Sequence, residues 1–371
     1  MTKGDFFVMR TTFATQGKIV GAALMFFCCL AIVAFAQDST SSGPKPMYKV
    51  LNPKVGMEVI EPPASVPTWT GSFTYNNTKY TYRMVGFNPT QGATSTVEAY
   101  IIPIKMVITT KTGTRSYNPG HILPDGNSVI KGTVKSPIFD STTTYIQGGT
   151  NVGTTQYTDA FQRANFWGIV HTQTGYHLKL GGPKVLPIQT MSPPKADGAL
   201  GNAFGVNPAG LVNINWFDPQ AHALITTLAI PANVIPIFLT YNVYLTNGSP
   251  ILNNCCIGGY HTYDGVQAYM QFSYVDVPGA FSQDVSALSH EAGEWADDPL
   301  TNNNSPCGIL EVGDPLEGNP NYGAFPYTVN GFTYNLQDLV TLPYFGAPPS
   351  TSVNNFFTFQ GEVLSVCQNG S

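Results

Sequence analysis

His290 and Glu294 stand four residues apart in the stretch SHEAGEWADDP, residues 289–299. On an α-helix, residues with this spacing are neighbours on one face, so their imidazole and carboxylate can bind the same metal ion. Glu291 follows the first expected ligand, and we expect it to act as the general base that takes a proton from metal-bound water. The stretch differs from the zinc-peptidase motif HExxH because a glutamate replaces the second histidine.

A catalytic metal site needs a third protein ligand and one open position. The stretch GILEVGDPLEG, just downstream, offers Glu311 and Asp314. We expect Glu311 to be the third ligand and Asp314 to orient the ring of His290 by a hydrogen bond. Asp298 is a further candidate. The predicted metal site is therefore made of His290, Glu294, Glu311 and Asp314.

The ligand types favour Zn²⁺, although two carboxylates with one imidazole also suit Ca²⁺ or Mn²⁺. The alternative interpretation needs no metal at all. A histidine and a glutamate four residues apart are also common on the solvent-facing side of an ordinary helix.

The pattern around the motif predicts a helix over residues 282–298, with Ser282 as its N-cap and Pro299 at its end. An apolar stripe should pack on the core, with His290 and Glu294 on the opposite side. The stripe consists of Val285, Leu288, Ala292, Trp295 and Ala296. Gly293 is unfavourable in a helix by about 1 kcal/mol relative to alanine, so we expect another segment or an ion to approach it closely.

Most of the remaining chain has the alternation and the β-branched and aromatic content of strands. The clearest strand signals lie at 81–87, 96–111, 210–217, 234–246 and 266–277, and 158–170 predicts a short helix. The predicted fold class is α+β, with a strand-rich N-terminal half and a C-terminal half that carries the metal-site helix.

Charge divides the chain near residue 195. Residues 1–195 hold all 17 Lys and Arg, whereas residues 196–371 have none and contain 14 of the 22 Asp and Glu. We therefore distinguish a β-rich basic half, 67–195, from an acidic half, 196–371. An acidic half without basic residues repels nucleic acid and attracts cations, so no nucleic-acid partner is expected.

The N-terminus has the features of a secretory signal. Lys18 precedes the apolar run IVGAALMFFCCLAIVAF, which ends in Ala34-Phe35-Ala36. We expect a signal peptide over 1–36 and a loose Pro- and Ser-rich leader over 37–66. The alternative is an uncleaved membrane anchor. The mature chain is expected to be secreted, periplasmic or on the cell surface, without a membrane segment after cleavage.

Cys255, Cys256, Cys307 and Cys367 remain after the expected cleavage, and an even number in an exported chain predicts two disulfides. Neighbouring cysteines rarely pair with each other. We therefore expect Cys255 and Cys256 to pair with Cys307 and Cys367, in an order that the sequence leaves open.

Residues 255–318 resemble a motif of secreted bacterial zincin-like proteins and, more distantly, of the plant phosphate-induced (EXORDIUM-like) proteins. The resemblance rests on SHEAGEWADDPLTNNNSP, on LEVGDPL and, more weakly, on CCIGGYHTYDG. It implies a zincin-like C-terminal half, with functional roles for His290, Glu291, Glu294, Glu311 and Asp314.

Together these features predict a secreted metal-dependent hydrolase, most simply a zinc peptidase with a polypeptide substrate. The alternative is a non-catalytic cell-surface or matrix protein with a structural metal site, and a weaker one is a carbohydrate-binding module. His261, in GGYHTYDG, is expected to be a structural loop residue, with a role in stabilising an oxyanion as the alternative.

Overall fold

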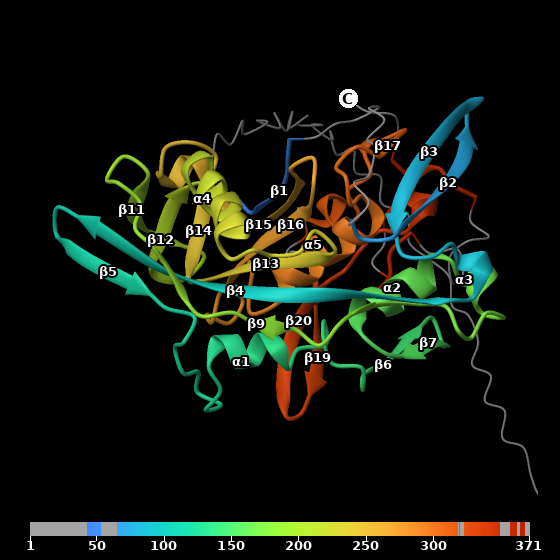
Figure 1. Ribbon diagram of the computed structural model, residues 1–371, viewed down its shortest axis with the longest axis horizontal. Helices are drawn as coiled ribbons and strands as arrows, with labels where there is room; N and C mark the ends of the chain where they lie inside the picture. Colours follow the sequence, from blue (N-terminus) through green and yellow to red (C-terminus); the bar gives the residue numbers. More distant parts are fainter. Residues whose placement is uncertain are drawn as a thin grey trace, which may run out of the picture. The chain divides into compact units, whose positions relative to one another are not determined.

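The longest strand in the described part of the chain is β4 (Thr94–Thr110). It pairs in parallel with β13 (Val234–Tyr241), and this pairing joins the two halves of the chain in one sheet. We describe the fold from a computed structural model (Figure 1). It describes residues 43–52, 65–317, 319, 323–348, 357–361 and 364–367. The expected signal peptide, 1–36, lies outside the described residues.

A mixed sheet of 12 strands forms the centre of the fold (Figure 1). Its main path runs β10-β4-β13-β16-β15-β14-β12-β11, and β1, β5, β8 and β9 pair at its margins. β13 is parallel to β4 and β16, whereas β15 is antiparallel to both β16 and β14. The structure is therefore mixed α and β and rich in strands, as the sequence indicates at this level.

The remaining strands of the large sheet are β1 (Met47–Leu51), β5 (Gly113–Tyr117), β8 (His177–Leu180), β9 (Lys184–Val185), β10 (Gln189–Met191), β11 (Gly198–Ala203), β12 (Val206–Asn213), β14 (Val243–Thr246), β15 (Cys255–Tyr263) and β16 (Ala268–Tyr274). Four separate hairpins are formed by β2 (Thr68–Tyr75) with β3 (Thr78–Val85), β6 (Thr144–Gln147) with β7 (Thr150–Thr154), β17 (Asn304–Ser305) with β18 (Gly308–Ile309), and β19 (Ala324–Val329) with β20 (Phe332–Gln337). The α-helices are α1 (Val129–Val134), α2 (Tyr157–Asn165), α3 (Trp167–Val170), α4 (Ile214–Thr227) and α5 (Ser286–Asp297).

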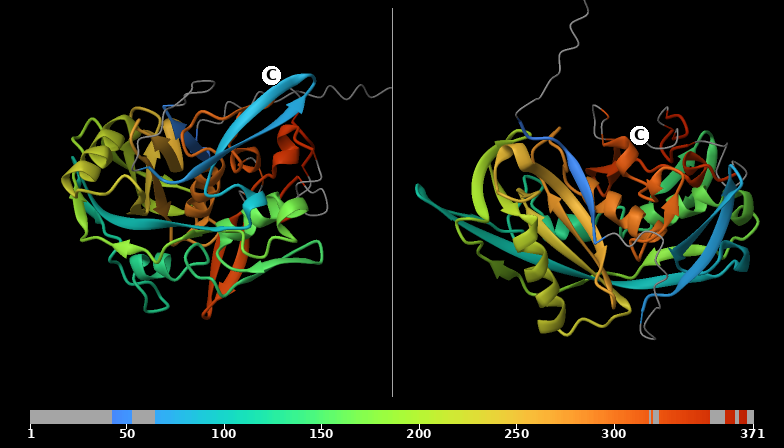
Figure 2. Two further views of the ribbon diagram at one scale, coloured as in Figure 1. Left: turned by 45° about the vertical axis from the view of Figure 1, so that its right-hand side comes forward. Right: turned by 90° about the horizontal axis from the view of Figure 1, so that it is seen from above.

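Both faces of the central strands are covered. Every residue of β13 and of β15 is buried, as expected for strands that lie between two layers. On one face Ile237 and Leu239 belong to the core that also contains α5, whereas Val234 and Phe238 face the core covered by α4. The right-hand view of Figure 2 shows the yellow-green helix α4 and the orange helix α5 on opposite sides of the strands.

Helix α5 is buried along its whole length. All of its residues, from Ser286 to Asp297, are buried, and it packs against β15, β16, β20, β3 and α2. The predicted apolar stripe is part of this packing, because Leu288, Ala292 and Trp295 have at most 1 % of their surface exposed. The alternative interpretation, in which His290 and Glu294 lie on a solvent-facing side of an ordinary helix, is wrong.

The start of α5 differs from the predicted one. Ser282, expected as the N-cap, has φ of +62° and donates its hydroxyl to the carbonyl of Ser273, and the helix begins at Ser286. The link to β20 is made by Asp284, whose carboxylate accepts hydrogen bonds from the backbone and side-chain nitrogens of Asn335 at 2.9 and 2.6 Å. Long-range polar contacts, which local spacing does not encode, therefore set the entry into the helix.

Two other elements differ from expectation. The strand predicted over 210–217 ends at Asn213, whose side chain caps α4 by accepting from the N–H of Asn215. The helix predicted over 158–170 is divided into α2 and α3. In the segment expected to be a loose leader, residues 47–51 form β1, a parallel partner of β15.

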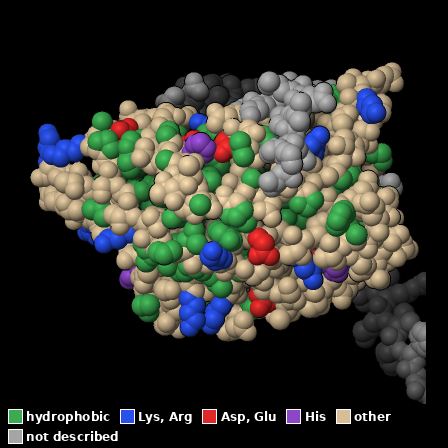
Figure 3. All heavy atoms as spheres, viewed as in Figure 1, with side chains coloured by type: hydrophobic (Ala, Val, Ile, Leu, Met, Phe, Trp, Pro, Cys, Tyr) green, Lys and Arg blue, Asp and Glu red, His purple; other side chains and the backbone are tan. Residues whose placement is uncertain are grey.

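The boundary near residue 195 divides the basic half from the acidic half, but it does not divide the described chain into separate compact units. β4 comes from the basic half and pairs with β13 of the acidic half from Val234↔Glu98 to Leu239↔Pro103. The described residues accordingly belong to one compact unit. Charged side chains are few on the face shown in Figure 3. In the part of the chain that the structure describes, no helix is long and apolar enough to cross a membrane.

The cysteine pairing corrects the expectation. Cys255 pairs with its neighbour Cys256, and Cys307 pairs with Cys367. Both members of the first pair are fully buried within β15, whereas Cys307 follows β17 and lies beside the carbonyl of Tyr344, where the chain end returns. The fold therefore holds the two pairs in separate places, and the rule against neighbouring cysteines fails here.

The Asp284 link predicts how stability depends on pH. Burial raises the pKa of Asp284 to about 7. Because the native carboxyl keeps its proton more tightly than the unfolded chain does, its contribution to stability is complete below about pH 4 and is lost as pH rises to about 7. We expect Asp284→Asn, which cannot ionise, to gain up to about 4 kcal/mol relative to the native chain between pH 4 and pH 8.

Urea unfolding of both proteins at the two pH values measures this difference, and the contributions of all other titrating groups cancel in the comparison. An unchanged difference between the two proteins would show that Asp284 does not titrate in this range.

Candidate metal centre

Two histidines and four carboxylates meet between α5, β15 and the loop after β18. His290, Glu291 and Glu294 come from α5, and His261 comes from β15. The loop after β18 adds Glu311 and Asp314. Side chains alternate between the faces of a strand, and in β15 this turns Tyr260 into the α4-side core and His261 towards α5.

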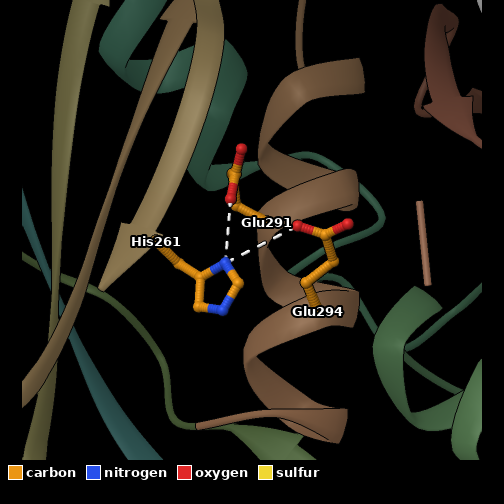
Figure 4. Close-up of side chains that lie close together, drawn as sticks. All are labelled: His261, Glu291 and Glu294. Carbon is orange, nitrogen blue, oxygen red and sulfur yellow. Dashed lines mark hydrogen bonds and ion pairs between the residues drawn. The ribbon is translucent and has the colours of Figure 1, made fainter. Parts of the chain in front are cut away.

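The inner group consists of His261, Glu291, Glu294 and Glu311. Oε2 of Glu291 lies 3.3 Å from Nδ1 of His261, Oε2 of Glu294 lies at 3.5 Å, and Oε2 of Glu311 lies at 3.9 Å. Figure 4 shows the ring of His261 pointing from its strand towards the two glutamates of the helix. Three carboxylates thus converge on one ring nitrogen, and at most 6 % of any of these four side chains is exposed.

The outer group consists of His290, Glu294 and Asp314. Nε2 of His290 lies 3.0 Å from Oε1 of Glu294 and 3.5 Å from Oδ1 of Asp314. Oε1 of Glu294 also accepts the backbone N–H of Gly313 at 3.1 Å. The side chain of Asp314 is 42 % exposed, so this group lies at the solvent side of the cluster.

Glu294 belongs to both groups. Its Oε1 faces His290 and its Oε2 faces His261. In each group of His261, Glu291 and Glu294, and of His290, Glu294 and Asp314, one ligand atom per residue lies within 4.8 Å of the others. Each triad is therefore compact enough for its members to share one cation.

Two glycines let the groups close. A Cβ at Gly313 would lie 2.2 Å from Nδ1 of His290, and a Cβ at Gly259 would lie 2.7 Å from Oε1 of Glu291. A side chain at either position would push the imidazole or the carboxylate away. The close approach expected at Gly293 is made by the side chain of Leu339, because a Cβ there would lie 2.5 Å from its Cδ1.

The β1 segment covers the outer group. The ring of Tyr48 stacks on His290 with 3.6 Å between centroids, and the backbone N–H of Tyr48 donates to Oε1 of Glu317. Along the same strand, Val50 is in register with His261 of β15. Part of the expected leader is thus built into the wall of the site.

Electrostatics make the cluster unusual, because residues 196–371 contain no Lys or Arg. Although burial lowers the pKa of His261, the neighbouring carboxylates of Glu291 and Glu294 raise it to about 10. The pKa of His290 is likewise well above its ordinary value, because Glu294 and Asp314 outweigh the effect of burial. The neighbouring carboxylates therefore favour the positively charged form of both imidazoles.

Two positively charged imidazoles cannot balance the negative charge of four ionised carboxylates. Burial raises the pKa of Glu291 to about 7, and burial together with Glu294 holds the pKa of Glu311 well above its usual range. Glu294 differs: burial opposes its ionisation, but the two imidazoles keep its pKa below the usual range. The cluster thus retains protons that a divalent cation would replace by its own charge.

Many atoms of the cluster lack a hydrogen-bond partner among the described residues. They are Nε2 of His261, both ring nitrogens of His290, Oε1 of Glu291, Oε2 of Glu294, both carboxylate oxygens of Glu311 and Oδ1 of Asp314. Four of these atoms have only the ion-pair contacts given above: Nε2 of His290, Oε2 of Glu294, Oε2 of Glu311 and Oδ1 of Asp314. Buried polar atoms are rarely left without a hydrogen bond, because the loss of hydration is then incompletely compensated. Imidazole nitrogens and carboxylate oxygens are suitable ligands for Zn²⁺ and Mn²⁺, so the donor set fits a divalent cation.

The structure brings together some predicted site residues and separates others. His290, Glu294 and Asp314 meet as a compact triad, although Asp314 was expected to act as an orienting group. Glu311, expected beside His290, approaches His261 with Glu291. Asp298 belongs to neither group, and its Oδ1 accepts from the N–H groups of Asn302 and Asn303.

Sequence reasoning assigned His261 to a loop, but it is fully buried in a strand. The alternation of CCIGGYHTY could have placed its ring on the face opposite to that of Tyr260. However, the pairing of β15 with β16 and the packing of α5 on this face depend on distant segments, so the local sequence does not reveal them.

Comparisons of the chain with protein-family models, with curated proteins and with solved structures give no match.

The contact between Gly313 and His290 predicts the effect of a single methyl group. We expect Gly313→Ala to lower the free energy of unfolding by about 1–3 kcal/mol, because the added carbon overlaps the imidazole. The matched control is Gly182→Ala, since a Cβ at Gly182 would have no atom within 4 Å, and its effect should stay within about 0.5 kcal/mol. Urea unfolding measures both, and equal stabilities would contradict the tight packing around His290.

Proposed function

We propose that the chain is a secreted metal-dependent hydrolase that acts on polypeptides, with a zincin-like arrangement in its C-terminal half. The observation that carries the proposal is the outer group, in which His290, Glu294 and Asp314 present unpartnered buried atoms beside an exposed edge. A hydrolase needs such an edge, because substrate and water must reach the ion. The fully buried inner group has no comparable access.

The residues of the outer group would hold Zn²⁺, through one imidazole and two carboxylates. A bound ion would act as a Lewis acid that polarises the scissile carbonyl and activates water. Tyr48 restrains the ring of His290 by stacking, and the N–H of Gly313 holds Oε1 of Glu294. These contacts fix the ligands before an ion arrives, which lowers the entropy cost of binding it.

Glu291 is the proposed proton acceptor. It stands next to His290 in α5, and one of its ligand oxygens lies within 4.8 Å of one from Glu294. Its Oε1 is buried and has no hydrogen-bond partner in the described part of the chain. Because Oε2 of Glu291 faces His261, Oε1 is the oxygen available to take a proton from the attacking water and to pass it to the leaving amine.

The test combines metal analysis with one conservative substitution. We expect purified protein to contain zinc, and Glu291→Gln to reduce polypeptide hydrolysis at least about 100-fold while at least one ion per chain remains bound. Glu98→Gln is the matched control, because Glu98 is exposed on β4, outside both groups. Cleavage of a labelled unstructured polypeptide is the readout, and unchanged cleavage by the Glu291 variant would remove the proposed mechanism.

A second candidate function follows from the burial of the cluster. His261, Glu291 and Glu294 are at most 1 % exposed, and Tyr48 covers His290. These features favour a non-catalytic cell-surface or matrix protein in which the ion is a structural clamp. In that case chelation would lower the melting temperature, and the native chain would cleave no polypeptide or ester substrate.

A further inference from the structure

The inner group remains outside the proposed catalytic centre, yet it has the more complete set of donors. His261 and Glu311 contribute nothing to the outer group, and they come from a strand and a loop that α5 holds together. A purely structural explanation would require hydrogen bonds that fix these side chains. His261 has one such contact, from Nδ1 to Oε2 of Glu291 at 3.3 Å. Both oxygens of Glu311 and Oε2 of Glu294 have no hydrogen-bond partner among the described residues, although Glu311 is only 5 % exposed and Glu294 only 1 %.

We propose that the inner group is a second divalent-cation site and that the carboxylate of Glu294 bridges the two ions. The donors of the inner site are Nδ1 of His261, Oε2 of Glu294 and Oε2 of Glu311. Oε2 of Glu291, 3.3 Å from the same nitrogen, adds a fourth donor and leaves Oε1 for proton transfer. The inference rests on the proposed function through two shared residues: Glu294, which belongs to both sites, and Glu291, the proposed base.

The bridging role follows from the orientation of Glu294. A carboxylate that served one ion would have its second oxygen free for a hydrogen bond or for solvent. Here Oε1 faces Nε2 of His290 at 3.0 Å, and Oε2 faces Nδ1 of His261 at 3.5 Å. Each oxygen therefore belongs to a different imidazole and a different set of acids, as in carboxylate-bridged ion pairs.

Charge balance also favours two ions over one. The cluster holds Glu291, Glu294, Glu311 and Asp314, and no Lys or Arg occurs in the acidic half of the chain. One divalent ion offsets two carboxylates and would leave two without a metal partner, at least one of them buried because only Asp314 is substantially exposed. Two divalent ions offset all four, with both imidazoles neutral and free to act as ligands.

The donors indicate the class of ion. The inner site offers one nitrogen and three carboxylates, which is richer in oxygen than the outer triad of one nitrogen and two carboxylates. Oxygen-rich sites suit Mn²⁺ as well as Zn²⁺, so Mn²⁺ is a suitable probe for both sites. Because one carboxylate joins the sites, two bound Mn²⁺ ions would lie close enough for their spins to couple.

The experiment measures ions per chain after equilibrium dialysis of the purified protein against Mn²⁺, together with the electron paramagnetic resonance spectrum. We expect two ions and a coupled spectrum for the native chain. His261→Gln and Glu311→Gln should each bind one ion with an uncoupled spectrum, because the outer triad remains. His290→Gln should also bind one, at the inner site. His222→Gln, at a half-exposed histidine paired with Asp264, is the matched control and should bind two.

Circular dichroism verifies folding of each variant, and Glu311→Gln decides the matter if His261→Gln does not fold. One ion in the native chain that is kept in the His261 and Glu311 variants but lost in His290→Gln would overturn the inner site and leave the proposed catalytic centre intact. One ion lost in all three variants would mean a single shared site and would also overturn the inference. No bound ion would overturn both proposals.

Discussion

The burial of three carboxylates around two imidazoles, with Asp314 at the solvent edge, is the constraint on which the rest of this structure depends. An ionised carboxylate in a protein interior is strongly unfavourable unless it is paired or bound to a metal. Here the ion pairs of these carboxylates in the described part of the chain are made with the two histidines and not with Lys or Arg. The compensating charge must come from protons or from cations. The raised pKa values of Glu291 and Glu311 correspond to compensation by protons. A bound divalent ion would displace these protons and supply the positive charge itself.

The surrounding fold serves to hold these groups within a few ångströms of one another. β15 and β16 form one wall, and the apolar stripe of α5 is fixed among them, β20 and α2. Glycines at 259 and 313 remove the side chains that would keep Glu291 and His290 at a distance. The Asp284 link to Asn335 ties the start of α5 to β20. Precision at the cluster is thus a property of packing over three separate segments, and the motif alone does not provide it.

The sequence predicted the part of the site that lies on one helix, because helical spacing is a local property. His290 and Glu294 were placed together by their four-residue separation, and the downstream loop was identified by its acids. His261 was not recognised, since its position depends on the pairing of β15 with β16 and on the packing of α5 across that strand. The sequence also could not predict that Glu311 approaches His261 whereas Asp314 approaches His290. The turn at Gly313 decides which carboxylate reaches which imidazole.

Errors elsewhere have the same origin. The sequence correctly indicated a strand-rich mixed fold, and 96–111 and 234–246 correspond closely to β4 and to β13 with β14. It did not reveal that these segments, from halves of opposite charge, share one sheet. The pairing of Cys255 with Cys256 shows how a general rule for neighbours can fail when strand packing separates both from Cys307.

The N-terminal strand β1 borders the route by which solvent reaches the cluster, because its Tyr48 stacks on His290. Within the two groups, Asp314 alone has a substantially exposed side chain, so a substrate would reach the outer ion past this residue. Tyr48 and Glu317 lie on the same rim, because Tyr48 stacks on His290 and its N–H donates to Glu317. A substrate that reached His290 would therefore have to share this rim with β1 or displace it. The two groups are thus separated physically: the outer group meets solvent at a rim that β1 partly covers, whereas the inner group is enclosed and reaches the outer one through Glu294 and the neighbouring Glu291.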